Sequence, residues 1–263
     1  MLVIGENING SSTSVSRAIN NRDEEFIENL VKAQSDAGAD FIDVNSGRQE
    51  TTTMEWLIKV IQATTDKPLA IDSDTPSVIE AALRNYSGDR LIINSVTAEP
   101  ERLAAIGTLA AEKKAWLVAL AMGEEGIPET VGQRLAACDV IMNYISRLGM
   151  SPGQILFDPL VLPISVDSNQ GLITLETIKQ IKSHYPTAKT VMGLSNISFG
   201  LPSRKLVNRA FMLMATYAGL DAVILNPLDT KMMSLIKIAE MLTGKDIFSR
   251  NYIRAYRKGN IVE

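Results

Sequence analysis

Cysteine and histidine are nearly absent from this chain of 263 residues, which contains one of each, Cys138 and His184. A single cysteine excludes a disulfide within the chain. One cysteine and one histidine also leave too few nitrogen and sulfur ligands for a zinc cluster. We therefore expect no metal ion to be ligated by the protein itself.

Clusters of basic residues and long apolar runs are missing as well. Lys and Arg number 26 against 30 Asp and Glu, and the net charge of −4 argues against nucleic acid as a partner. The apolar start, residues 1–5, is too short for a signal peptide and lacks its basic beginning. No apolar run reaches the roughly 18 residues of a membrane span. These absences predict a cytoplasmic protein without a membrane partner.

Aliphatic residues, in contrast, are abundant. Hydrophobic residues make up 46% of the chain although aromatics make up only 5%, so one large aliphatic core is expected in a single domain spanning residues 1–263. Short apolar runs alternate with helical patterns along the whole chain. The runs lie at residues 2–5, 41–44, 69–71, 91–93, 115–120, 155–157, 190–192 and 222–225.

Short, wholly apolar strands separated by helices are typical of a parallel sheet that is covered on both faces. Eight such units in a chain of this size predict an α/β fold, a single (β/α)8 TIM barrel. The alternative is a doubly wound open sheet, but no glycine-rich dinucleotide-binding motif follows the first predicted strand. Residues 10–21, which are rich in Ser and Thr, are predicted to form a mobile loop.

Polar side chains lie at the C-terminal ends of the predicted strands, where TIM-barrel active sites form. Carboxylates accept hydrogen bonds from an amino group and a ring N–H, and carboxamides both donate and accept. The set predicts a site for an uncharged, nitrogen-rich heterocycle such as a pterin or purine. Asp43 and Asn45 satisfy loop backbone groups equally well. The set is Glu6, Asn7, Asn9, Asp43, Asn45, Asp72, Asp74, Asn94, Ser95, Asp158, Ser195, Asn196, Asn226 and Asp229.

Six short motifs occur in order along the chain: IGENIN from residue 4, ADFIDVN from 39, PLAIDS from 68, INS from 93, FDPL from 157 and GLSN from 193. Together they resemble the pterin-binding methyltransferases, which transfer a methyl group between tetrahydrofolate and the cobalt of a corrinoid protein. The resemblance covers nearly the whole chain. It is strongest to the free-standing methyltetrahydrofolate–corrinoid protein methyltransferases of anaerobic bacteria, including those of glycine betaine demethylation.

This resemblance implies a substrate, a partner and an assembly. The substrate is tetrahydrofolate or 5-methyltetrahydrofolate, and a separate protein carries the corrinoid, a cobalamin. The implied methyl flow runs from methylcorrinoid to tetrahydrofolate, in a demethylation pathway of the methylamine or betaine type. The resemblance also implies a homodimer, for which Phe211, Met214 and Tyr217 are candidate interface residues or, equally, barrel core residues.

Roles for individual residues follow from the same resemblance. Asp72, Asn94 and Asp158 align with residues that hydrogen-bond the pterin ring, with Asp158 at its amino-pyrimidine edge. Asn196 aligns with the catalytic asparagine that approaches N5, the nitrogen that carries the methyl group. The remaining predicted folate-binding residues are Glu6, Ser95, Gly193, Ser195 and Arg204.

Two other functions stay open. A dihydropteroate synthase must hold a pyrophosphate and should carry basic residues late in the chain, whereas residues 226–229 after the last strand read Asn-Pro-Leu-Asp. A non-catalytic folate-binding subunit would tolerate the loss of Asn196. Arg204 lies near a predicted helix start, where the helix dipole disfavours a cation, so a ligand or an acidic partner is the better explanation of its position.

Overall fold

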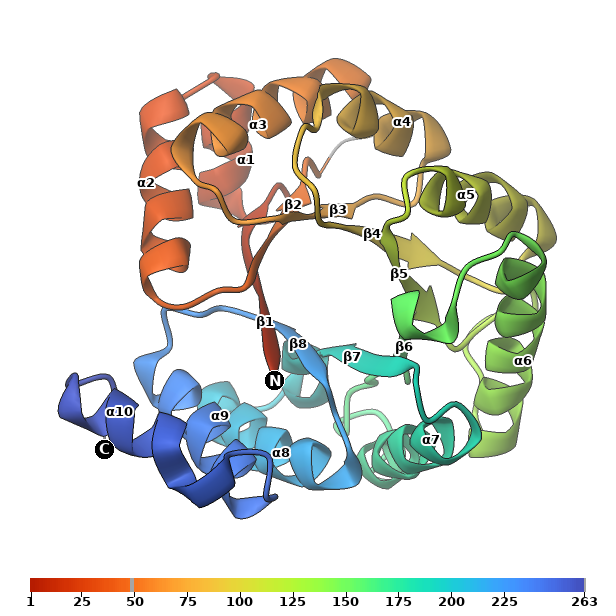
Figure 1. The fold of residues 1–263 in the computed structure, drawn as a ribbon, viewed down its shortest axis with the longest axis vertical. Helices are drawn as coiled ribbons and strands as arrows, with labels where there is room; N and C mark the ends of the chain where they lie inside the picture. The colour runs from red at the N-terminus through yellow and green to blue at the C-terminus, as the bar shows by residue number, and fades with distance from the viewer. Residues whose placement is uncertain (48–49, 263) are drawn as a thin grey trace.

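The computed structural model describes residues 1–47 and 50–262. Eight parallel strands follow one another in chain order around a closed barrel (Figure 1), so the predicted TIM barrel is confirmed. The strands are β1 (Leu2–Asn9), β2 (Phe41–Asn45), β3 (Leu69–Asp72), β4 (Leu91–Val96), β5 (Trp116–Leu120), β6 (Ile155–Asp158), β7 (Lys189–Gly193) and β8 (Ala222–Leu225).

Helices form the outer ring of the barrel, and α10 lies beside α9 at the C-terminal end of the chain (Figure 1). Among the described residues, no helix is long and apolar enough to cross a membrane. The α-helices are α1 (Thr13–Asn20), α2 (Glu24–Asp36), α3 (Thr51–Thr64), α4 (Pro76–Asn85), α5 (Pro100–Glu112), α6 (Val131–Arg147), α7 (Gln170–His184), α8 (Arg204–Ala218), α9 (Thr230–Leu242) and α10 (Arg250–Arg257). Three short 3-10 helices are η1 (Pro152–Gln154), η2 (Leu194–Ser198) and η3 (Ile247–Ser249).

The first connection differs from the prediction. The composition of residues 10–21 predicts a mobile loop, but α1 occupies most of that segment. Val15, Ala18 and Ile19 are buried on one face of this helix, a spacing of three and four residues that outweighs the Ser and Thr content. Strand β1 also continues to Asn9, so Glu6 lies within the strand and not in the loop after it.

The barrel interior begins with an apolar layer to which every strand contributes one residue. Side chains alternate across a strand, so the residues two positions further along also point inward, nearer the C-terminal ends. The interior thereby changes from apolar to polar at the end where TIM-barrel active sites lie. The apolar layer is Ile4, Phe41, Ala70, Ile92, Val118, Leu156, Val191 and Ala222. The next layer includes Glu6, Asp43, Asp72, Asn94, Leu120, Asp158 and Gly193.

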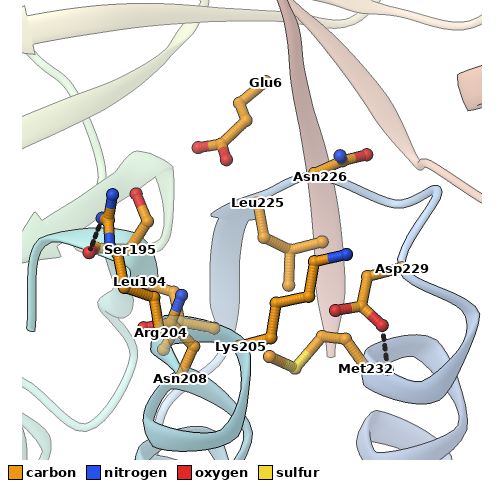
Figure 2. A pocket seen from close by; sticks show the side chains of 10 residues that line it. All are labelled: Glu6, Leu194, Ser195, Arg204, Lys205, Asn208, Leu225, Asn226, Asp229 and Met232. Atoms are coloured by element: carbon orange, nitrogen blue, oxygen red, sulfur yellow. Dashed lines mark hydrogen bonds between the residues drawn. The ribbon is translucent and has the colours of Figure 1, made fainter. Parts of the chain in front are cut away.

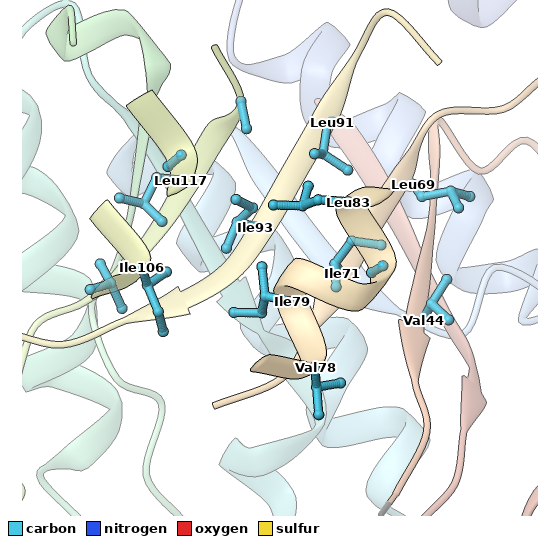
Figure 3. Packing of buried hydrophobic residues seen from close by; sticks show 14 of the residues in the cluster. Val44, Leu69, Ile71, Val78, Ile79, Leu83, Leu91, Ile93, Ile106 and Leu117 are labelled. Carbon is cyan, nitrogen blue, oxygen red and sulfur yellow. The ribbon is translucent and has the colours of Figure 1, made fainter. Parts of the chain in front are cut away.

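The opposite face of each strand packs against the helices. Figure 3 shows this packing around α4, where Ile79 and Leu83 lie against Ile71 and Ile93 of the neighbouring strands. All four side chains are at most 5% exposed. Burial of this aliphatic layer supplies the main driving force for closing the barrel and holds the strand ends in place.

Candidate functional site

Three carboxylates lie close enough on adjacent strands to influence one another: Glu6 within β1, Asp43 within β2 and Asp72 at the end of β3. Asp43 is only 2% exposed. Burial raises the pKa of Asp43 well above its usual range, and the charges of Asp72 and Glu6 raise it further, while a hydrogen bond from Asn94 opposes them. Burial also raises the pKa of Glu6, against the opposing charge of Arg204. This arc of the barrel mouth can therefore retain a proton at a pH where isolated carboxyl groups are ionised.

Amide side chains complete the same arc. The Asn45 Nδ2 atom donates to Asp72 Oδ2 at 2.8 Å. The Asn94 Nδ2 atom donates to Asp43 Oδ1 at 3.4 Å, and Asn94 is the direct register partner of Asp72 in the β3–β4 pair. Burial raises the pKa of Asp72, and the bond from Asn45 opposes that rise. The sequence left Asp43 and Asn45 undecided; the structure places Asp43 two residues after the inward-facing Phe41, on the same face of β2.

Asp158 ends β6 on another side of the mouth. Its Oδ1 atom accepts a hydrogen bond from the Leu160 backbone N–H at 2.8 Å. Burial raises the pKa of Asp158 to about 6, an increase that the Leu160 and Gly193 amides and the charge of Arg134 reduce. Asp158 is therefore mostly ionised at pH 7, and it can accept hydrogen bonds with both oxygens.

The 3-10 helix η2 follows β7 directly and carries Ser195 and Asn196. Asn196 is exposed, whereas Ser195 is half-buried. Arg204 donates from Nη2 to the Ser195 carbonyl at 2.7 Å and from Nε to Ser198 Oγ at 3.1 Å. These bonds to η2 give Arg204 a structural role that the sequence interpretation missed. A role in folate binding stays a prediction.

Glu6 and Ser195 line a cavity of about 340 Å³. Figure 2 shows Glu6 on one side of it and Arg204 and Lys205, from the first turn of α8, on the other. A second cavity of about 350 Å³ lies beside Asn45 and Asp72. Glu6, Asn45 and Asp72 thus border open space large enough for parts of a bicyclic ligand. Asn94, Asp158 and Asn196 line neither of these two cavities.

Asn226 and Asp229, which follow β8, also line the first cavity, and both side chains already form hydrogen bonds within the protein. Asn226 Oδ1 accepts a hydrogen bond from Asn7 Nδ2 at 3.0 Å. Asp229 Oδ1 accepts one from Arg209 Nη2 at 2.6 Å, and it caps α9 by accepting from the Met232 N–H at 3.1 Å.

The predicted site residues therefore lie at the same end of the barrel. Glu6, Asp72, Asn94, Asp158 and Gly193 occupy inward-facing positions near the ends of five strands. Ser95 is 8% exposed, and its carbonyl accepts a hydrogen bond from Arg102 Nη2 at 3.2 Å. In the described part of the chain, no three Asp, Glu, His or Cys residues form a group that could hold a metal ion. The binding and catalytic roles of these residues remain predictions.

The sequence between residues 5 and 226 matches the family of pterin binding enzymes, and the chain belongs to that family. It is similar to the methylcorrinoid:tetrahydrofolate methyltransferase of Eubacterium limosum, with 34% identity over 99% of this chain and 98% of the relative. It is also 32% identical to the methionine synthase of Mycobacterium tuberculosis, in a match that covers 91% of this chain but only 21% of that much longer protein.

Solved structures of dihydropteroate synthases share the fold. The enzyme of Xanthomonas albilineans in complex with 7,8-dihydropteroate superposes with a TM-score of 0.70 at 18% identity, covering 92% of each chain. The enzyme of Coxiella burnetii in complex with pteroic acid gives a TM-score of 0.70 at 17% identity, covering 93% of this chain and 94% of that one. At these identities the likeness concerns the barrel alone.

Proposed function

We propose that this protein is a methyltransferase that moves a methyl group between N5 of tetrahydrofolate and the cobalt of a corrinoid protein. The observation that carries the proposal is the polar layer at the C-terminal end of the barrel, in which carboxylates and amides from separate strands face inward. Full-length similarity to a methylcorrinoid:tetrahydrofolate methyltransferase supports this choice within the family.

The proposed pterin contacts follow from the hydrogen-bonding capacity of this layer. Ionised Asp158 accepts from the amino group and the adjacent ring N–H of the pyrimidine edge. Asp72 and Asn94, paired in register, offer an acceptor and a mixed donor–acceptor to the rest of the ring. Because Asp72 already accepts from Asn45 through Oδ2, its Oδ1 atom is the oxygen assigned to the ligand.

Transfer of the methyl group requires N5 to become a better leaving group. A hydrogen bond or proton at N5 must strengthen in the transition state to accelerate the reaction. We assign the hydrogen bond to Asn196, whose amide cannot release a proton at neutral pH. The proton then comes from solvent or from water held by the acidic arc, where burial and like charge raise the pKa of Asp43. Cobalt(I) takes the methyl group in one direction, and N5 takes it from methylcobalt(III) in the other.

The open end of the barrel is the proposed docking face for the corrinoid protein, since the methyl-bearing nitrogen must be reached from that side. Phe199, at the end of η2, is 63% exposed on this rim and stacks under Arg204, whose Cζ atom lies 5.8 Å from the ring centroid. We propose methyl flow from methylcorrinoid to tetrahydrofolate, in demethylation of a methylamine or betaine type, within the cytoplasm.

A homodimer is part of the same proposal. An apolar groove of about 420 Å³ runs between α7 and α8, lined by Leu172, Leu206 and Met214 among others. Met214 and Tyr217 are 49% and 80% exposed, whereas Phe211 is 6% exposed and belongs to the core. Light scattering of the purified protein at micromolar concentration should give twice the monomer mass, and a monomer there would refute the dimer.

Replacement of Asn196 by Ala tests the proposed chemistry. Tetrahydrofolate binding should stay within a few-fold of wild type, whereas methyl transfer from methylcobalamin should fall about a hundredfold, as for loss of one transition-state hydrogen bond. Asn143→Ala is the matched control, because Asn143 is an exposed asparagine on α6 away from the mouth. Unchanged transfer by Asn196→Ala would refute the catalytic role of Asn196. A wild-type protein that binds tetrahydrofolate but transfers no methyl group would favour the non-catalytic subunit. A wild-type protein that binds no tetrahydrofolate would refute the function as a whole.

The groups at the end of β8 do not favour a dihydropteroate synthase. Asn226 and Asp229 follow this strand, and the nearby Arg209 guanidinium donates a hydrogen bond to the Asp229 carboxylate. A pyrophosphate would meet that carboxylate at close range, which is electrostatically unfavourable, and Arg204 and Lys205 are the cations of the same cavity that would have to outweigh it.

A further inference from the structure

Arg134, on α6, is the largest fully buried side chain of the described residues. Its guanidinium binds main-chain and amide oxygens. Nη1 donates to the carbonyls of Pro159 at 2.7 Å and Leu160 at 2.9 Å, Nη2 donates to Gln170 Oε1 at 3.0 Å, and Nε donates to the Pro128 carbonyl at 3.4 Å. A buried charge is costly even when hydrogen-bonded, so its presence beneath the β6–α7 loop requires an explanation.

The peptide group between Pro159 and Leu160 links this arginine to the site. Its carbonyl accepts from Arg134 Nη1 at 2.7 Å, and its N–H donates to Asp158 Oδ1 at 2.8 Å. In a trans peptide the C=O and N–H bonds point in opposite directions, so this one peptide stands between the guanidinium and the carboxylate. A cation on the carbonyl polarises the peptide and strengthens its N–H as a donor.

The loop conformation needs such support. Leu160 has a φ of 65°, a backbone region that non-glycine residues rarely adopt and that the surroundings must stabilise. Arg134 binds the carbonyls on both sides of the Leu160 Cα, and Thr174 Oγ1 donates to the Leu160 carbonyl at 3.2 Å. Rotation of the Leu160 backbone out of this region would turn its N–H away from Asp158.

We infer that Arg134 is a positioning residue for Asp158: through the Pro159–Leu160 peptide it fixes the orientation of the carboxylate and stabilises its ionised form. The inference deepens the proposed function, because an ionised Asp158 is what accepts both hydrogens of the pyrimidine edge. The coupling between Arg134 and Asp158 is nevertheless a property of the ligand-free protein.

Within residues 1–47 and 50–262, the other groups that face Asp158 do not supply a positive charge. Strand β5 places Leu120 opposite it, and β7 presents the Gly193 amide. Lys189, also on β7, lies at the other end of the barrel against the Trp116 ring, 5.2 Å from its centroid. Cys138, one turn after Arg134 on α6, is a buried thiol whose pKa is raised by burial, so it is neutral at pH 7.

Titration of Asp158 in the ligand-free protein tests the inference directly. Carboxyl-¹³C NMR of aspartate-labelled protein, with the Asp158 signal assigned by Asp158→Asn, should show a wild-type midpoint at about pH 6. Arg134→Gln should move it upward by about one pH unit or more, and Arg134→Lys by less. Thr174→Val, which removes a neutral bond to the same loop, should leave it nearly unchanged. An unchanged midpoint in Arg134→Gln would overturn the inference. If Arg134→Gln does not fold, Arg134→Met, which also removes the charge, is judged by the same criterion.

Binding of tetrahydrofolate supplies a second readout that a purely structural role would not reproduce. Arg134→Gln, or Arg134→Met if the glutamine variant does not fold, should bind tetrahydrofolate more weakly than wild type at pH 6.5, by about threefold for a one-unit rise in the pKa of Asp158, and binding should recover at pH 9. Equal weakening at both pH values would contradict the inference. A wild-type protein without affinity for tetrahydrofolate would refute the proposed function, while the ligand-free titration would still decide the role of Arg134.

Discussion

Asp158 should lower the stability of the free protein at neutral pH. The carboxylate lies at a buried strand end, where desolvation raises its pKa from the ordinary 3.8 to about 6. Replacement by Asn removes the charge, keeps an oxygen that can accept from the Leu160 N–H, and nearly preserves the volume. We therefore expect Asp158→Asn to be more stable than wild type at pH 8 while it binds tetrahydrofolate more weakly.

The magnitude and sign follow from proton linkage. A rise in pKa from 3.8 to about 6 corresponds to about 3 kcal/mol, at roughly 1.4 kcal/mol per pH unit. Between these two values the folded state binds the proton more tightly than the unfolded state, so acidification stabilises the fold. The cost of the ionised carboxylate is therefore complete above pH 6, falls through the range from 6 to 4, and is absent below. The gain in Asp158→Asn should be about 1–3 kcal/mol at pH 8 and near zero at pH 4.

Urea unfolding of both proteins at pH 8, 6 and 4.5 measures this difference. Asp229→Asn is the control of opposite sign. Burial opposes ionisation of Asp229, but the bonds from Arg209 and the Met232 N–H lower its pKa overall, so its charge stabilises the fold above that pKa. Loss of that charge should destabilise the protein at pH 8. An Asp158→Asn variant that is less stable than wild type at pH 8, by an amount that does not vary with pH, would refute the reasoning.

Further predictions concern Cys138, Gly5 and Arg204. Cys138 is fully buried, and burial raises its thiol pKa, so a thiol reagent should modify it in urea at least a hundredfold faster than in the native protein. In Gly5→Ala the new Cβ would lie 2.5 Å from Gln34 Oε1, the acceptor for the Asn7 N–H, and urea unfolding should show a loss of about 1–3 kcal/mol. Arg204→Gln removes charge-assisted bonds to η2, so protease cleavage near residues 194–200 should become faster; an unchanged cleavage rate would contradict this bracing role.

Much of the fold was predictable because its signals are local. The eight apolar runs all became strands, and Pro76 begins α4 where a proline is tolerated. The prediction for the first connection was wrong because Ser and Thr content was weighted above the buried spacing of Val15, Ala18 and Ile19. For Asp43, strand alternation gives the same face as Phe41, but only the structure shows that this face points inward.

The hydrogen-bond partners of the site residues could not be predicted from local sequence patterns. The helix dipole alone assigns Arg204 to a ligand, yet this side chain binds the Ser195 carbonyl and Ser198. Arg134 carried no signal, because the four oxygens that it binds belong to residues 128, 159, 160 and 170, in three separate segments. A local sequence pattern holds no information about contacts between such segments.

The sequence by itself determined the strand–helix alternation, and with it the end of the barrel at which each polar residue lies, because these residues follow or end the apolar runs. Which face of a strand points inward was decided by the closed barrel, because these strands are apolar on both faces. Tertiary structure alone decided which of these carboxyls hold raised pKa values, which amides they bind and which arginine supports Asp158. Desolvation and Coulomb energies depend on distances between segments that only the closed barrel brings together.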